Sequence, residues 1–285
     1  MAKFFCPHCH GADPVPISES QCPVCRRELV SPNIRLASDA GEVLAFQRRV
    51  DDARVQLRAR NCEAEGEAFA TQAALSSAVV CRAPGHLLEL VSNPNSIYST
   101  FYNQLDGQSR LPQDNEYDQW RAVIDAIMFP NFFRSIVFAA LSLNGLGVVA
   151  YGACSIVLKE VAFAHRASVF HENSFKFIKD YKLKATDPLP HGYRATWDRR
   201  AELALAKLHG RVNSSMSTSD YAEVLLRQKT ATVEDDFIEV HIFGGFSRGA
   251  IERIVVTQPE DRIERHVLKG VVAKARAASI PVEMR

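Results

Sequence analysis

The chain has 285 residues, of which 47% are hydrophobic, so it can bury a substantial core. Lys and Arg number 34 and Asp and Glu 33, which excludes an overall electrostatic attraction to nucleic acid or to a membrane surface. An odd set of cysteines outside the N-terminal pairs (Cys62, Cys81 and Cys154) fits a reducing compartment better than a disulfide framework. The first residues contain no apolar signal segment, so a cytoplasmic location is expected.

Two Cys-x-x-Cys pairs lie near the N-terminus, twelve residues apart: Cys6, Cys9, Cys22 and Cys25. Four thiolates at this spacing can bind one zinc ion tetrahedrally, and the metal can order a segment that is too small for its own core. Four cysteine ligands leave no open position for water, so we expect a structural zinc ribbon over residues 1–30. Whether the ribbon also recognises nucleic acid or protein stays open. His8 and His10 could replace a thiolate, but the regular spacing favours the cysteines.

Residues 38–80 are predicted to form mostly helix. Apolar residues recur at intervals of three and four: Val43, Phe46, Val50, Ala53 and Leu57. This narrow seam either packs on the main domain or forms an arm for dimerisation or for an inhibitor. A second helix is expected over 63–80, and 31–83 is predicted to be a helical connector.

The stretch from Ser135 to Leu158 has no charged residue and is long enough to cross a membrane. Asn144-Gly145 and Gly147 give a turn signal in its middle, and both halves are rich in β-branched and aromatic residues. Two buried strands joined at 144–147 therefore fit better than a membrane span.

The remaining elements predict an α+β fold with a strand-rich C-terminal half. We expect strands over 86–92, 161–170, 174–181, 237–243, 253–257 and 280–282, and helices over 117–129, 196–208 and 260–278.

The strand 237–243 carries the best catalytic candidate. Its alternation places Glu239 and His241 on the side opposite Ile238, Val240 and Ile242. The alternative is an ordinary solvated face on an edge strand.

The run Glu239-Val240-His241-Ile242-Phe243-Gly244-Gly245-Phe246, followed by 250–256 (AIERIVV), resembles the end of the ADP-ribosyltransferase fold. It is most similar to bacterial toxins that modify nucleic acid, including the DarT family. The resemblance implies an ADP-ribosyltransferase-like domain over 84–285 with a split central sheet, NAD as substrate, and Glu239 as the catalytic carboxylate. It also implies a nucleic-acid acceptor more than a protein, and an antitoxin or other inhibitor as partner.

Other site residues follow from the same resemblance. Tyr151 matches an aromatic position on a second central strand that stacks on nicotinamide, with Gly152 beside it, and His86 matches a residue on the adjacent first strand that binds ribose. Arg134 is the competing first-strand residue, and the loop at Asn144 could approach NAD closely because glycines lack side chains. The family's Arg-type branch has Ser-Thr-Ser and an acidic or amide residue two positions before the catalytic Glu. Here Ser217-Thr218-Ser219 lies close to Glu239 and is interpreted as a helix cap, and Phe237 stands two before Glu239, which leaves modification of protein arginines in doubt.

Cleavage of the bond between nicotinamide and ribose develops positive charge on the ribose, which a nearby carboxylate stabilises. The run 193–200 joins aromatics to arginines, which suits single-stranded nucleic acid, although a helix start with a buried Trp197 is the simpler interpretation.

The sequence thus favours an NAD-dependent mono-ADP-ribosyltransferase, a bacterial toxin or phage-defence effector with no membrane partner. One alternative is a zinc-ribbon adaptor without enzymatic activity. Another is a nuclease-like toxin that uses Glu239 and His241 with His171 or His191.

Overall fold

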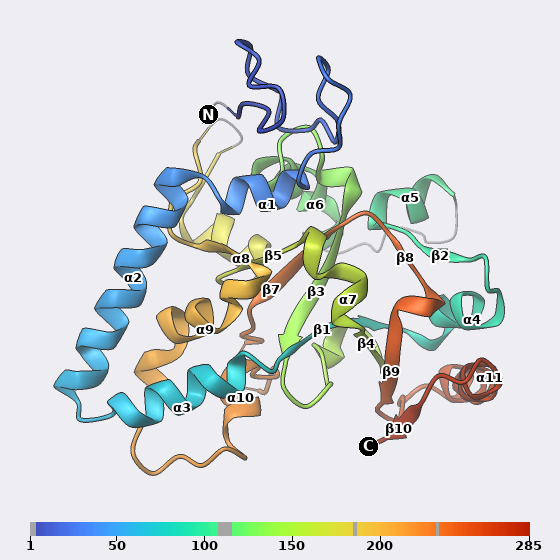
Figure 1. Ribbon diagram of the computed structural model, residues 1–285. Coiled ribbons are helices and arrows are strands. Elements are labelled where there is room, and N and C mark those ends of the chain that lie inside the picture. The colour runs from blue at the N-terminus through green and yellow to red at the C-terminus, as the bar shows by residue number, and fades with distance from the viewer. Residues whose placement is uncertain (1–3, 108–115, 185–186, 232–233) are drawn as a thin grey trace.

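The computed structural model describes residues 4–107, 116–184, 187–231 and 234–285, which form a mixed α/β structure (Figure 1). Its centre is an eight-stranded sheet with the order β10-β9-β4-β1-β3-β7-β5-β6, antiparallel except for the β9–β10 pair. The strands of this sheet are β1 (Ser77–Arg82), β3 (Ile136–Ser142), β4 (Cys154–Leu158), β5 (Ala167–Phe170), β6 (Arg194–Thr196), β7 (Glu239–Phe243), β9 (Ile251–Val256) and β10 (Val282–Met284). A separate pair joins β2 (Ile97–Tyr98) to β8 (Phe246–Ser247).

Helices surround the sheet (Figure 1). The α-helices are α1 (Pro32–Ala37), α2 (Ala40–Ala59), α3 (Glu63–Ala73), α4 (Pro84–Ser92), α5 (Phe101–Asp106), α6 (Glu116–Met128), α7 (Glu160–Phe163), α8 (Ser174–Asp180), α9 (Arg200–Leu208), α10 (Tyr221–Leu225) and α11 (Arg262–Ala277). Short 3₁₀ turns are η1 (Phe133–Ser135), η2 (Val149–Tyr151), η3 (Ala164–Arg166), η4 (Trp197–Arg199), η5 (His209–Arg211) and η6 (Arg248–Ala250).

The two faces of the sheet are buried by different helices. On one face, Val240 and Ile242 of β7 share a large core with side chains of α2, α3 and α9, such as Phe46 and Phe69. On the other face, Ile136 of β3 packs in a second core with side chains of α6 and α8. Alternate residues of β3 and β5 therefore supply both cores, and none of the residues of β7 is exposed.

The predicted seam of α2 packs on the main domain, except for Val43, which is 38% exposed. Asp39 caps the helix by accepting a hydrogen bond from the amide of Gly41, and Phe46, Val50 and Leu57 are buried in the large core. The segment 31–83 also contains β1, which lies between β3 and β4 in the sheet. It therefore contributes a central strand as well as helices.

The uncharged stretch 135–158 forms β3 and β4, as expected, with a turn between them. The side chain of Asn144 accepts a hydrogen bond from the amide of Leu146, and Gly145 has a positive φ of 78°. The two strands do not pair with each other, because β1 lies between them. Among the described residues, no helix is both long and apolar enough to cross a membrane.

Three strand predictions are wrong in whole or in part. Residues 86–92 belong to helix α4, since Pro84 starts a helix and Leu87, Leu90 and Val91 follow a helical period. Residues 174–181 form α8, where the side chain of Asn173 accepts from the amide of Lys176 and caps the helix. In 161–170 only the last four residues form a strand.

The C-terminal elements follow the prediction more closely. β7 is a strand with the expected alternation, but it lies between β3 and β5 and is not an edge strand. Helix α11 begins after Asp261, whose side chain accepts from the amide of Glu264. The last strand begins two residues later than predicted, at Val282.

Candidate metal centre and active-site cleft

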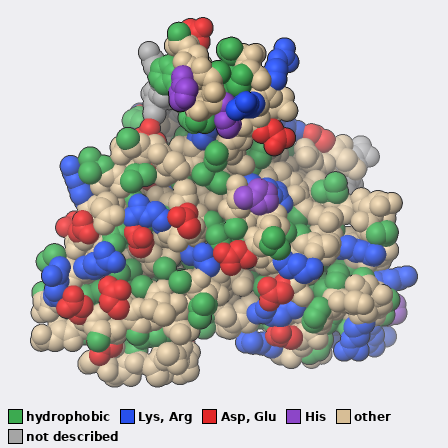
Figure 2. Space-filling view, in the orientation of Figure 1, with side chains coloured by type: hydrophobic (Ala, Val, Ile, Leu, Met, Phe, Trp, Pro, Cys, Tyr) green, Lys and Arg blue, Asp and Glu red, His purple; other side chains and the backbone are tan. Residues whose placement is uncertain are grey.

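The four paired cysteines converge at the N-terminus, where the ribbon stands above the rest of the chain (Figures 1 and 2). The sulfur atoms of Cys6, Cys9, Cys22 and Cys25 all lie within 4.8 Å of one another. Backbone amides of His8 and Cys25 donate to the sulfurs of Cys6 and Cys22, at 3.4 and 3.5 Å, as expected around thiolates. The imidazole of His8 instead contacts the carbonyl of Glu28. The donor set therefore fits a closed, structural Zn²⁺ site.

A cavity of about 530 Å³ opens beside the centre of the sheet. Strands β1 and β3 pair only as far as Val79 and Ala140, and the next residues of β1 pair only with β4, on the other edge of the strand. Cys81 of β1 and Phe138 of β3, just beyond this last pair, both line the cavity. A cavity of this size is large enough for a small-molecule ligand.

Glu239 lies in the wall of this cavity at the start of β7, with a relative exposure of 5%. Its Oε2 accepts hydrogen bonds from the backbone amide of Ser174 at 3.2 Å and from His241 Nε2 at 2.9 Å. Both bonds end on Oε2, so Oε1 is the oxygen that we expect to meet a ligand. The carboxylate is thus oriented before any ligand binds.

His241 supports this carboxylate from within the core. Its ring packs against Phe129, Phe138 and Phe170, and the residue has an exposure of 1%. Burial lowers the pKa of His241, while the neighbouring Glu239 opposes that shift. A neutral imidazole facing a carboxylate carries its proton on Nε2, so His241 donates to Glu239.

Two of the predicted NAD-binding residues line the same cavity as Glu239: Tyr151 and His86. Tyr151 is 47% exposed, and its hydroxyl accepts a hydrogen bond from Asn173 Nδ2 at 3.3 Å. The expectation that both residues lie on central strands is wrong. Tyr151 belongs to the turn η2 and His86 to helix α4.

Arg134 and Asn144 are not among the residues that line the cavity. Arg134 instead forms an exposed ion pair with Asp106 and lies over the ring of Tyr102. The side chain of Asn144 closes the turn after β3.

Gly152 contributes through its backbone. Its φ is 141°, and an added Cβ would lie 2.1 Å from the carbonyl carbon of Arg82. Glycine is therefore required for η2 to approach the end of β1 closely. This close approach brings Tyr151 and Arg82 to one cavity.

Sequence reasoning missed three charged residues that line the cavity: Arg82, Arg121 and Asp125. Arg82 ends β1, and the first four residues of this strand fall within the helix predicted over 63–80. Asn173 and Ser174 are brought near Glu239 by β5, which pairs with β7. No local pattern in the sequence shows this pairing.

Asp125 of α6 is a second buried carboxylate in the cavity wall. Its Oδ2 accepts from the hydroxyl of Tyr102 at 2.8 Å and from Arg121 Nε at 3.3 Å. Burial raises the pKa of Asp125 to about 6, against the partly compensating charge of Arg121.

Half of the side chains in the arginine-rich run 193–200 are buried. Arg194 is buried and donates to the carbonyl of Met128 at 2.7 Å, and Arg200 is held by the carbonyls of Trp197 and Ala74. Trp197 is also buried, with Nε1 on Glu160. The simpler interpretation, a helix start with a buried Trp, therefore agrees with the structure, and two of the three arginines of the run are buried.

The serine-rich segment 217–219 does not cap α10 through its own side chains. Asp220 occupies the cap position, and its carboxylate accepts from the amide and the hydroxyl of Ser217. The segment is outside the cavity wall.

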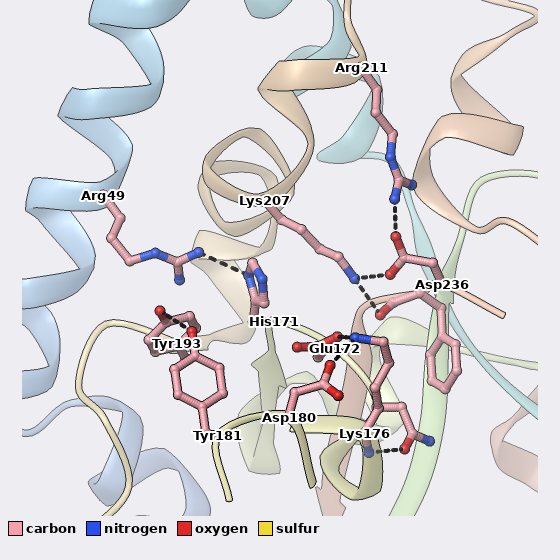
Figure 3. A network of polar contacts seen from close by, with 12 residues as sticks. Arg49, His171, Glu172, Lys176, Asp180, Tyr181, Tyr193, Lys207, Arg211 and Asp236 are labelled. Atoms are coloured by element: carbon pink, nitrogen blue, oxygen red, sulfur yellow. Dashed lines mark hydrogen bonds and ion pairs between the residues drawn. The ribbon is translucent and has the colours of Figure 1, made fainter. Parts of the chain in front are cut away.

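Polar contacts near the cavity wall join the chain before β7 to α9 and to η5 (Figure 3). The buried Lys207 Nζ donates to the carboxylate of Asp236 and to the carbonyl of Phe237, two residues before Glu239. Arg211 pairs with the other oxygen of Asp236. This arrangement fixes the chain as it enters β7.

The nuclease alternative required two histidines near one phosphate position. His171 Nδ1 faces Arg49 at 3.0 Å, and burial, together with that guanidinium, lowers its pKa to about 2. Neither His171 nor His191 is a lining residue of the cavity. His241 is not a lining residue either, so the cavity that holds Glu239 does not hold the proposed pair of histidines.

An adaptor that binds nucleic acid is expected to carry a continuous basic surface. On the face shown in Figure 2, Lys and Arg side chains alternate with Asp and Glu over α2 and gather mainly near α11.

No known family model matches the chain, and no curated protein matches it either.

Proposed function

We propose that this protein is an NAD-dependent mono-ADP-ribosyltransferase in which Glu239 is the catalytic carboxylate. The observation that carries the proposal is the placement of Glu239 in the wall of a 530 Å³ cavity, oriented by two hydrogen bonds and sharing that cavity with Tyr151. A carboxylate fixed in this way stabilises positive charge that develops on a ribose as its bond to nicotinamide breaks.

The other lining residues suit the remaining groups of NAD. The half-exposed ring of Tyr151 offers an aromatic surface for nicotinamide, and Arg82, His86 and Arg121 offer donors to a diphosphate. The end of the β1–β3 pairing beside the cavity supports a central sheet that opens at the site, as the resemblance to ADP-ribosyltransferases implies.

The acceptor and the biological role rest on the sequence resemblance. We propose a nucleic-acid acceptor, a role as a bacterial toxin or phage-defence effector, and a cognate inhibitor protein. In this proposal Zn²⁺ has a structural role.

The test is incubation of the purified protein with labelled NAD and, in separate reactions, single-stranded DNA, RNA or protein. We expect release of nicotinamide and transfer of label to nucleic acid. Glu239→Gln keeps the shape of the side chain but removes its charge, so NAD consumption should fall on the order of a thousandfold, or about 4 kcal/mol in the transition state.

Glu223→Gln, which changes an exposed carboxylate on α10, is the control and should act like the wild type. If the wild type consumes no NAD, or if Glu239→Gln consumes it at an undiminished rate, the assignment is wrong. The first of these outcomes would favour the adaptor alternative.

A further inference from the structure

The short helix α1 connects the zinc ribbon to the strand that carries Glu239. Asn33 of α1 has an exposure of 1%, and its Nδ2 donates to the carbonyl of His241 at 2.9 Å. The same amide nitrogen also contacts Ser168 Oγ and the carbonyl of Arg166, both at 3.2 Å. One side chain therefore binds the two neighbouring strands β5 and β7.

These contacts fall at one position of the sheet. Ser168 of β5 and His241 of β7 are directly paired, and the imidazole of His241 holds the carboxylate of Glu239. Movement of the His241 backbone would therefore move the hydrogen bond that orients Glu239.

Asn33 binds the sheet through its amide nitrogen alone. Its Oδ1 is buried and has no hydrogen-bond partner in the described part of the chain. An unpaired buried amide oxygen costs stability and offsets part of the gain from the hydrogen bonds of Nδ2. The contribution of Asn33 therefore lies in the groups that its Nδ2 binds.

The other side of α1 binds the ribbon. Arg35, with an exposure of 6%, donates to the carbonyls of Pro16, Ile17 and Glu19, and its guanidinium lies 4.5 Å from the ring centroid of Phe4. A helix of six residues is thus fixed to the ribbon by Arg35 and to the sheet by Asn33.

We propose that Asn33 is a positioning residue of the candidate active site, which acts on Glu239 through the backbone and ring of His241. This inference rests on the proposed function for its catalytic consequence. It also predicts a physical coupling between α1 and His241 that exists whether or not the protein consumes NAD.

The test compares Asn33→Leu, which keeps the volume but removes the amide, with Ser76→Ala. Ser76 is also buried, and its hydroxyl donates to the carbonyl of Ala73, so Ser76→Ala controls for the removal of a buried hydrogen bond. Two quantities are measured for the full chain: kcat and KM for NAD consumption, and the ¹⁵N chemical shifts of the His241 ring.

We expect Asn33→Leu to lower kcat by about 10- to 100-fold with little change in KM, because small displacements of catalytic groups have effects of this size. The ring signals of His241 should shift in the same variant. Ser76→Ala should leave both readouts at their wild-type values.

The proposal is overturned if Asn33→Leu retains the wild-type kcat, or if the His241 signals stay unchanged. If the wild type consumes no NAD, the proposed function fails, and the ring signals alone decide whether Asn33 positions His241. Should Asn33→Leu not fold, Asn33→Gln, which displaces the amide by one methylene group, takes its place for the same readouts.

Discussion

Replacing Asp125 with asparagine should change how the stability of the protein depends on pH. Asp125 is 2% exposed and its pKa is raised from 3.8 to about 6, chiefly by burial. The folded state therefore holds a proton that the unfolded state releases between these two values. Stability must fall as the pH rises through this window, and the loss is complete above about pH 6.

The difference between 3.8 and about 6 corresponds to about 3 kcal/mol in total. About 2 kcal/mol of this should appear between pH 4.5 and pH 7.5. The side-chain amide of the Asp125→Asn variant would keep an acceptor for Tyr102 and Arg121 but would not ionise. The stability of this variant relative to the wild type should therefore rise by about 2 kcal/mol over this range.

The assay is urea unfolding at pH 4.5 and pH 7.5, with Asp52→Asn on the exposed face of α2 as the control. The ribbon is the same in all three proteins, so any loss of metal at low pH cancels in the comparison. A difference between Asp125→Asn and the wild type that does not vary with pH would refute the reasoning.

Two further predictions concern the ribbon and the network of Figure 3. The purified protein should contain one zinc per chain, Cys22→Ser should lose it, and Cys62→Ser, which changes a buried cysteine outside the cluster, should retain it in metal analysis. Asp236→Ala should destabilise the fold by about 3–5 kcal/mol because it leaves the buried Lys207 without its counter-charge, whereas Lys207→Met leaves Asp236 paired with Arg211 and should cost roughly 1–2 kcal/mol. Equal losses of stability for these two variants in denaturant unfolding would contradict the second prediction.

The elements that could be predicted from the sequence are those whose signals are local. The cysteine spacing, the alternation of β7 and the seam of α2 each depend on residues that are close in the chain. The helix α4 was missed because its apolar run is short, and a short run fits a strand as well as a helix.

The cavity could be predicted only in part, because it is built from strands that are distant in the chain. Glu239 was found by its pattern and resemblance, but Asp125 lies on an ordinary amphipathic helix and Ser174 contributes through its backbone amide. Arg82 could be placed in the cavity only if β1 had been predicted. The sequence of β1 follows two helices, with no glycine or proline to mark where the second helix ends. Tertiary pairing, which brings these residues to one cavity, leaves no local trace.

The register of β7 connects the fold with the candidate site. The side of β7 that carries Val240 and Ile242 is buried in the large core, whereas the side that carries Glu239 faces the cavity and the donors from Ser174 and His241. A slip of one residue would place Val240 at the cavity and bury the carboxylate of Glu239 among apolar side chains. An unpaired charge in such a core costs several kcal/mol, far more than the loss of one strand contact. The carboxylate that we propose for catalysis therefore also selects the register that positions it.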